Sequence, residues 1–433
     1  MTDLLHRATV ASAPRRTGRV SRVVGLNLEV EGLDAGIGDG VVVDTANGPL
    51  HAEVVAITDD RLTCMPLGEL TGIRAGTPVI ASGGRLTVPV GTRLLGRVLD
   101  GLGRPIDSGP PLDGLARVTI DGSAPHPLRR STIQQQLPLG VRALDTLVPC
   151  GRGQRLGIFA GSGVGKSTLL SMIVRGTEAP VSVLALIGER GREVRQFLDQ
   201  DLGPEGLARS VVVVATSDEP ALVRLRAAFT ATRIAEWFRE QGLDVVLLMD
   251  SLTRFAMAQR EVGLSAGEPP ATRGYPPSVF ALLPRLLERA GTGERGSITG
   301  LYTVLVEGDD MNEPIGDTAR SILDGHIVLS RRLASAGHYP CIEVLDSVSR
   351  VAPAILTREQ VAAATELRRL LAAERDARDL VDIGAYVPGS NPTVDRALAL
   401  SNGIGAFLRQ PSDDTVPVDD SWSSLLSLVG GGR

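Results

Sequence analysis

The residues best suited to chemistry form a glycine-rich turn between an apolar strand and a helix. The strand is predicted over residues 156–159 and the helix from Thr168. In such a turn, backbone N–H groups and the helix N-terminus bind phosphate groups. The turn consists of Gly161, Ser162, Gly163, Val164, Gly165, Lys166, Ser167 and Thr168. Strand, turn and helix together predict a P-loop for ATP, in which Lys166 reaches the β and γ phosphates and the Ser167 hydroxyl ligates Mg²⁺.

The use of lysine in this chain supports that interpretation. Lysine and arginine total 45 residues, and Lys166 is the single lysine. An ammonium is a compact point charge, whereas a guanidinium is a wide planar fork. A chain that uses arginine everywhere else therefore retains lysine where a guanidinium would not fit between phosphates.

A second site residue is predicted at the end of a later strand. Residues 245–249 are an apolar run that ends in Asp250. A strand ending in a carboxylate, downstream of a P-loop, is typical of the Walker B arrangement, in which the carboxylate holds Mg²⁺ through its water shell. We therefore expect Ser167 and Asp250 to form the metal site.

Hydrolysis also needs a group that activates water. The strand expected over residues 183–187 leads to Glu189 and Arg190, which places both at the carboxyl edge of a sheet, where ligands collect. We interpret Glu189 as the general base, with Glu193 as the next candidate, and Arg190 as a stabiliser of phosphate charge. The alternative is a surface ion-pair cluster.

The pattern of apolar and turn-forming residues changes along the chain and predicts three domains, over residues 1–92, 93–356 and 357–433. Residues 18–90 show short alternating segments broken by glycine, Asp and Asn, the pattern of a small β barrel. Residues 150–350 alternate apolar strands with helices, which indicates a parallel, doubly wound α/β sheet. Thr357 and Gln360 form a plausible capping box that opens a helical region. From Pro411 the tail begins polar, and we expect it to be frayed.

Bulk composition excludes several classes of protein. The 433 residues carry a net charge of −5, which gives no general attraction to nucleic acid or anionic lipid. Three widely spaced cysteines, Cys64, Cys150 and Cys341, indicate buried thiols in a reducing compartment. Neither a membrane-spanning run nor an apolar signal segment is visible. We therefore expect a cytoplasmic protein that does not bind nucleic acid.

Longer motifs resemble the type III secretion ATPase family, which is similar to the catalytic subunit of rotary ATP synthases. The resemblance extends from about Gly18 to Leu408, and residues 18–32 look more like the flagellar branch than the virulence-type injectisome branch. The stretches are GERGREVR at 188–195, MDSLTRFAMAQRE at 249–261, GEPPATRGYPPS at 267–278, VEGDDMNEPI at 306–315 and SILDGHIVLS at 321–330.

The resemblance implies both a fold and an activity. The fold would be a RecA-like P-loop core between an N-terminal β barrel and a C-terminal helical domain. The activity would be MgATP hydrolysis that energises protein export. Glu189 would be catalytic, and Arg190 and Arg254 would contact phosphate or the transition state. Arg350 matches the arginine finger that reaches the neighbouring subunit's nucleotide; the alternative for Arg350 is a structural ion pair.

The resemblance also implies partners. A finger that acts across an interface implies a ring, which in this family is a homohexamer. The resemblance also implies a location that is peripheral to the cytoplasmic face of the inner membrane. The partners would be a stator-like regulatory protein, a coiled-coil stalk protein, export-gate membrane proteins, export substrates and their chaperones. A polar loop containing Asp309, Asp310 and Asn312 would face the stalk. Two features depart from the family pattern: the segment before Gly18 that would bind the stator-like protein is short, and no aromatic residue can be assigned to the adenine.

Three other kinds of protein share parts of this pattern. A rotary synthase catalytic subunit is disfavoured by Gly191 and by the loop at residues 309–314. A non-catalytic ring subunit would lack the acid at Glu189. An RNA-translocating hexamer should interleave aromatic and basic residues in its N-terminal domain, but residues 1–100 contain no Phe, Tyr or Trp.

Overall fold

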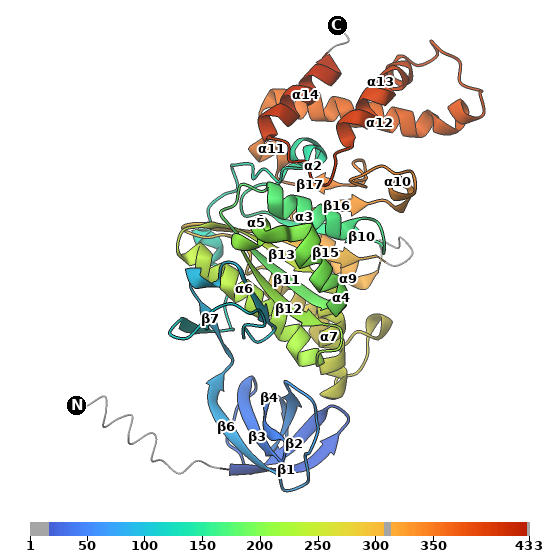
Figure 1. Ribbon diagram of the computed structural model, residues 1–433. Coiled ribbons are helices and arrows are strands. Elements are labelled where there is room, and N and C mark those ends of the chain that lie inside the picture. Colours follow the sequence, from blue (N-terminus) through green and yellow to red (C-terminus); the bar gives the residue numbers. More distant parts are fainter. Residues whose placement is uncertain (1–16, 307–312, 431–433) are drawn as a thin grey trace.

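The computed structural model describes residues 17–306 and 313–430 (Figure 1). The expected stalk-facing loop with Asp309, Asp310 and Asn312 lies outside these described residues. From one end of the molecule to the other, Figure 1 shows a β barrel, an α/β layer structure and a group of helices, in the order of the chain. No helix in the described ranges is long and apolar enough to cross a membrane.

The N-terminal region is the closed barrel that the alternating pattern predicts. Its strands follow the order β1-β2-β5-β4-β3-β6. Inward-facing residues such as Val20, Leu28, Val41 and Val54 form a separate core, because alternate side chains of a strand point to the same face. The strands are β1 (Thr17–Val24), β2 (Asn27–Glu31), β3 (Asp39–Thr45), β4 (Gly48–Thr58), β5 (Arg61–Pro66) and β6 (Pro78–Arg85).

The central region is built on a nine-stranded sheet of described residues. Its main path follows the order β17-β16-β10-β15-β13-β11-β12-β8. Neighbours from β16 to β8 run parallel, while β17 and the short β14 are antiparallel additions. The strands are β8 (Arg97–Asp100), β10 (Arg155–Ala160), β11 (Val181–Glu189), β12 (Ser210–Thr216), β13 (Asp244–Asp250), β14 (Gly291–Thr292), β15 (Ser297–Leu305), β16 (Gly325–Leu329) and β17 (Val348–Ser349). A separate antiparallel pair is formed by β7 (Thr87–Val90) and β9 (Ala116–Thr119), which lie on either side of β8 in the chain.

Helices cover both faces of this sheet, which confirms the doubly wound prediction. One core cluster joins the sheet to α6, α7 and α8, and a second joins it to α2 and α3. The strands are therefore apolar along most of their length, as a sheet buried on both faces requires. The helices are α2 (Arg142–Leu147), α3 (Lys166–Gly176), α4 (Gly191–Gln196), α5 (Gly203–Ala208), α6 (Ala221–Glu240), α7 (Leu252–Ser265), α8 (Pro277–Leu287), α9 (Pro314–Ile322) and α10 (Arg331–Ser335).

The C-terminal region is helical, and its first long helix begins at the expected capping box. Thr357 accepts from the Gln360 backbone N–H, and the Gln360 side chain accepts from the Thr357 N–H. The helices are α11 (Ala352–Ile355), α12 (Arg358–Asp382), α13 (Pro392–Leu408) and α14 (Val418–Gly430). The expectation of a frayed tail is wrong, because α14 buries Trp422 and Leu425 against the neighbouring helices.

Polar contacts join the barrel to the central region. The Arg226 side chain on α6 forms an ion pair with Glu53 of β4, and its Nε lies 2.8 Å from Glu53 Oε2. Asn27 at the start of β2 donates to the carbonyl of Ser265 at the end of α7. Burial raises the pKa of Glu53, although the charge of Arg226 opposes this. The barrel is thus fixed to two helices, α6 and α7, that pack on the central sheet.

Candidate active site

The glycine-rich turn has the backbone geometry of a phosphate-binding loop. Gly163 and Gly165 have φ of 74° and 79°, in the left-handed region where a side chain would be strained. Gly165 directly precedes α3, so the first N–H groups of that helix open onto the turn. Ser162, Gly163 and Ser167 are exposed, whereas Gly161 and Val164 are buried and anchor the turn.

Three residues predicted from separate motifs meet beside this turn. Lys166 Nζ lies 2.5 Å from Asp250 Oδ1 and 3.6 Å from Glu189 Oε1. The side chains of Lys166, Asp250 and Glu189 are only 14%, 6% and 19% exposed. They come together because β10, β13 and β11 are parallel strands of one sheet, and the P-loop, Asp250 and Glu189 all lie at its carboxyl edge.

The surroundings of Glu189 suit a general base. Burial raises the pKa of the Glu189 carboxyl, and the charge of Asp250 adds to this, while Lys166 and Arg254 oppose it. A base works best when its pKa lies near the pH of the reaction. The surroundings therefore raise the pKa of Glu189 in the direction that suits a base, while its carboxyl group stays next to Lys166.

Arg254 occupies the wall of the same site. It lies in the first turn of α7, where the Ser251 hydroxyl accepts from its backbone N–H. Gly188 has φ of 69°, and a Cβ there would come within 3.1 Å of the Arg254 side chain. The Nε of Arg254 is buried, with no hydrogen-bond acceptor among the described residues. A buried donor without an acceptor costs free energy, so Arg254 is suited to an anionic ligand.

Arg190 and Arg350 lie away from this cluster within one subunit. The Arg190 side chain is 76% exposed and forms an ion pair with Glu193. Arg350 follows β17 at the opposite, amino edge of the sheet, where its backbone N–H donates to the Asp324 carbonyl. Its guanidinium is exposed and donates to the Arg320 carbonyl at 3.3 Å.

Two residues of the site were missed in the sequence. Thr303, near the carboxyl end of β15, is fully buried and donates to Asp250 Oδ1 at 2.7 Å. Nothing in an apolar run identifies such a residue, because the contact depends on how β13 and β15 are aligned. Tyr339 is 47% exposed, and its ring lies 3.4 Å from the Cβ position of Gly165. The sequence clue that could have identified Tyr339 is that it is an aromatic residue in a chain with only 3% aromatic residues.

The available donors fit a magnesium ion bound together with phosphate. The residues are a hydroxyl at Ser167 and a carboxylate at Asp250, both oxygen ligands of the kind that Mg²⁺ prefers. Thr303 and Lys166 both contact Oδ1 of Asp250, so this carboxylate is oriented from one side. Within the described residues no group of three or more His, Cys, Asp or Glu side chains could hold a metal, and Mg²⁺ shared with a nucleotide does not require one.

Family models match all three regions of the chain. Residues 20–83 match the ATP synthase alpha/beta family, beta-barrel domain, and residues 140–349 match the nucleotide-binding domain of the same family. Residues 356–427 match the T3SS EscN ATPase C-terminal domain. The matches follow the three regions of the structure in order.

Whole-chain relatives give the same assignment. The chain is 51% identical to the flagellum-specific ATP synthase of Bacillus subtilis, over 99% of this chain and 98% of the relative. It is 50% identical to the type 3 secretion system ATPase of Xanthomonas euvesicatoria, over 99% and 97%. The structure of the assembled ATPase EscN of enteropathogenic E. coli, in complex with its central stalk EscO, covers 95% of this chain and 100% of that one, with 45% identity and a TM-score of 0.89.

The P-loop, the two carboxylates that meet at its lysine, and these full-length similarities lead to one conclusion. The chain belongs to the ATP synthase alpha/beta family and, within it, to the flagellum-specific and type III secretion ATPases.

Proposed function

We propose that this protein hydrolyses MgATP at the carboxyl edge of its central sheet. The observation that carries the proposal is the position of Lys166 between Asp250 and Glu189, directly beside the P-loop. Two carboxylates share one ammonium there, so negative charge is in excess, and a divalent cation can take the place of the ammonium beside Asp250 when Lys166 turns to the phosphates. Mg²⁺, held through Ser167 and Asp250, would neutralise charge on the β and γ phosphates.

The residues divide the work as follows. The backbone N–H groups of residues 161–168 and the ammonium of Lys166 bind the phosphates. Glu189 takes a proton from the attacking water as its oxygen bonds to the γ phosphorus. The bond from that phosphorus to the bridging oxygen breaks, which gives ADP and inorganic phosphate. Arg254 supports the charge on the transferred group, and Arg190, whose exposed side chain follows Glu189 in the chain, is the second candidate for this contact.

Arg350 completes the site of a neighbouring subunit. In one subunit, Arg350 and the P-loop lie at opposite ends of β10, whose six residues span about 20 Å. That distance is longer than an arginine side chain, so Arg350 acts across an interface as an arginine finger. This arrangement needs a closed ring, and we assign a homohexamer; the assembled state of the similar EscN supports a ring.

Tyr339 is our candidate for the adenine contact. Its half-exposed ring lies against Gly165, next to the phosphate loop. Aromatic faces stack on nucleobases and contribute about 1–3 kcal/mol per base. Tyr339 therefore supplies the aromatic surface that could not be assigned from sequence.

The biological role we propose is to energise protein export through a type III secretion apparatus. We favour the flagellar apparatus, because residues 18–32 look more like that branch; a virulence-type injectisome is the second candidate. The central stalk EscO that is bound to the similar EscN supports a stalk partner for this chain, and the family resemblance implies that this partner is a coiled coil. We further assign a stator-like protein, export-gate membrane proteins, substrates and chaperones as partners. We place the protein in the cytoplasm, peripheral to the inner membrane. We assign its domain boundaries after residues 92 and 356.

The proposal is tested by replacing the general base. Glu189→Gln keeps the size of the side chain but cannot accept the proton, so we expect turnover to fall by about 10²–10⁴-fold while MgATP still binds. Glu193→Gln is the matched control, since that acid is near Arg190 rather than Lys166. Turnover is measured by phosphate release and binding by a fluorescent nucleotide. Near-native turnover in Glu189→Gln, with loss in Glu193→Gln, would transfer the role of base to Glu193.

A further inference from the structure

The segment that carries Arg350 is held firmly upstream, where the Ser347 hydroxyl accepts from the Val328 N–H of β16, but it pairs with the central sheet over only two residues beside Arg350. Strand β17 has two residues, and it pairs with β16 only through Gly325 with Ser349 and His326 with Val348. Beyond that pairing, the Arg350 N–H donates to the Asp324 carbonyl at 3.0 Å. The exposed guanidinium makes a long hydrogen bond to a carbonyl. The position of Arg350 therefore depends on what holds its backbone.

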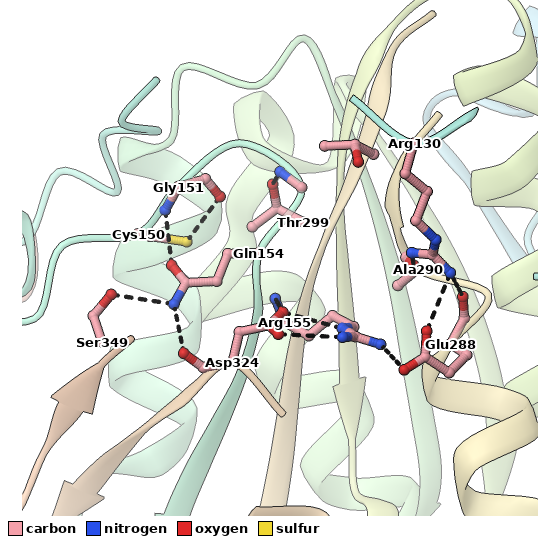
Figure 2. Close-up of polar contacts among 12 residues, drawn as sticks. Arg130, Cys150, Gly151, Gln154, Arg155, Glu288, Ala290, Thr299, Asp324 and Ser349 are labelled. Carbon is pink, nitrogen blue, oxygen red and sulfur yellow. Dashed lines mark hydrogen bonds and ion pairs between the residues drawn. The ribbon is translucent and has the colours of Figure 1, made fainter. Parts of the chain in front are cut away.

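Gln154, immediately before β10, provides an attachment from outside the β16–β17 pair. Its Nε2 donates to the Asp324 carbonyl and to the Ser349 hydroxyl, both at 3.1 Å (Figure 2). Its Oε1 accepts from the Gly151 N–H at 2.8 Å. Gln154 is fully buried, so its amide has no water to replace these partners. One side chain thus links the turn before β10 to Ser349, which precedes Arg350, and to Asp324, whose carbonyl accepts from the Arg350 N–H.

Asp324 is in turn fixed to the first residue of β10. Its backbone N–H donates to the Arg155 carbonyl, and its carboxylate accepts from the Arg155 N–H, Nε and Nη2. The Nη1 of Arg155 lies 2.5 Å from Glu288 Oε1, and Glu288 also contacts Arg130 (Figure 2). The Asp324 carbonyl accepts from the Arg350 N–H, and these mutual contacts give that carbonyl a defined position.

We propose that Gln154 is a positioning residue for Arg350, with the Asp324 carbonyl as the second point of support. This inference rests on the proposed role of Arg350 at the neighbouring subunit's site. A misplacement of about 1 Å can cost on the order of 10²-fold in rate, so a side chain that touches no substrate can matter for turnover. The same strand, β10, holds the nucleotide loop at its carboxyl end and supports the finger at its amino end.

The alternative is that Gln154 only stabilises the turn before β10. Both roles predict some loss of stability in Gln154→Met, which keeps the length of the side chain but removes both N–H donors. They differ in turnover. Positioning predicts that kcat falls by about tenfold or more while the KM for ATP changes little, because an interaction made in the transition state is lost. Thr299→Val is the matched control: it removes the hydrogen bond that the Thr299 hydroxyl accepts from Gly153 in the same turn, without touching the finger segment.

The decisive measurement is a double-mutant cycle in the full-length, assembled protein. If Gln154 acts through Arg350, then adding Gln154→Met to Arg350→Ala should lower single-turnover phosphate release no further than Arg350→Ala alone. An undiminished effect of Gln154→Met in the Arg350→Ala background would overturn the inference and leave the finger intact. Near-native turnover of Arg350→Ala would instead remove the finger, and the inference with it.

A milder variant covers the case in which Gln154→Met does not fold. Ser349→Ala removes one of the two acceptors of Gln154 and leaves the buried amide bound to Asp324. We expect a smaller loss of kcat, which is again absent when Arg350 is alanine. A loss of kcat of equal size in both backgrounds would contradict positioning.

Discussion

The two edges of the central sheet hold charged residues in different ways. At the carboxyl edge, Lys166 is shared by Asp250 and Glu189, and the buried Nε of Arg254 has no acceptor among the described residues. At the amino edge, Asp324 accepts three hydrogen bonds from Arg155, and Arg155 also faces Glu288. The first edge is arranged for a ligand and the second is complete within the protein. Substitutions at the first should affect turnover, and those at the second should affect stability or the finger.

The largest expected effect joins the two edges across a subunit interface. Arg350→Ala and Lys166→Ala should each be nearly inactive, since loss of a finger alone can cost about 10³–10⁵-fold. In rings co-assembled from equal amounts of both, roughly a quarter of interfaces combine an intact loop with an intact finger. We expect phosphate release to recover well above either parent.

This mixing experiment requires proof of subunit exchange, for which differently tagged chains suffice. Arg350 acting within its own subunit predicts no recovery, because every subunit in the mixture carries a defect. Co-assembled rings without activity above the parents would contradict a finger that acts on the neighbour.

Dilution should remove the neighbouring subunit's finger from the site without any mutation. A carboxyl edge that needs the amino-edge finger of a neighbour is incomplete in a monomer, so specific activity should rise with protein concentration. The measurement is phosphate release across a dilution series, with the assembly state followed by light scattering. Constant specific activity down to a demonstrated monomer would show that one subunit contains a complete site.

Breaking the amino-edge network should lower stability. Asp324→Asn leaves Arg155 with Glu288 as its acidic partner. The Arg155–Asp324 pair is partly buried, with side chains 13% and 27% exposed, so its loss should cost more than the roughly 0–1 kcal/mol of an exposed pair and less than the roughly 3–5 kcal/mol of a fully buried one; we expect about 2 kcal/mol. Arg190→Ala is the control, since its ion pair with Glu193 is exposed and should be worth about 0–1 kcal/mol. Urea unfolding of both variants measures the difference. Equal midpoints would show that the amino edge is no more tightly held than an exposed pair.

The smallest expected effect is a gain in stability at the carboxyl edge. The pKa of Glu189 is raised in the folded protein, mainly by burial. The stability associated with its protonated form is complete below the ordinary glutamate value of about 4.3 and is lost as the pH rises through the folded-state pKa. Nucleotide-free Glu189→Gln should therefore unfold at a higher temperature than the native chain at about pH 8, with a smaller difference at about pH 5.

Thermal unfolding at the two pH values tests this, with Glu193→Gln, which changes the acid paired with the exposed Arg190, measured in parallel. If Glu189→Gln is less stable than the native chain at the higher pH, then the ion pair with Lys166 outweighs the cost of burial. The carboxyl edge would then resemble the amino edge in being held by its charges.

The sequence by itself determined the kinds of element and most of the chemistry. A turn that must bind phosphate needs glycines and a lysine in one short segment, so Gly161 to Thr168 could be recognised locally. Apolar runs ending in Asp250 and in Glu189 also reveal themselves, because parallel strands bring their carboxyl ends to one edge. The capping box at Thr357 is likewise a local signal.

Only the tertiary structure decided which residues touch across strands and between distant segments. Thr303 contacts Asp250 because β13 and β15 are in one register, and neither strand encodes that register alone. Tyr339 reaches Gly165 across more than a hundred residues of chain. The tail forms helix α14 because Trp422 packs on an apolar surface that the local composition does not reveal. In the sequence, Gln154 is an ordinary polar residue of a turn. Its contacts with Asp324 and with Ser349 of β17 exist only because the fold packs these segments against the start of β10.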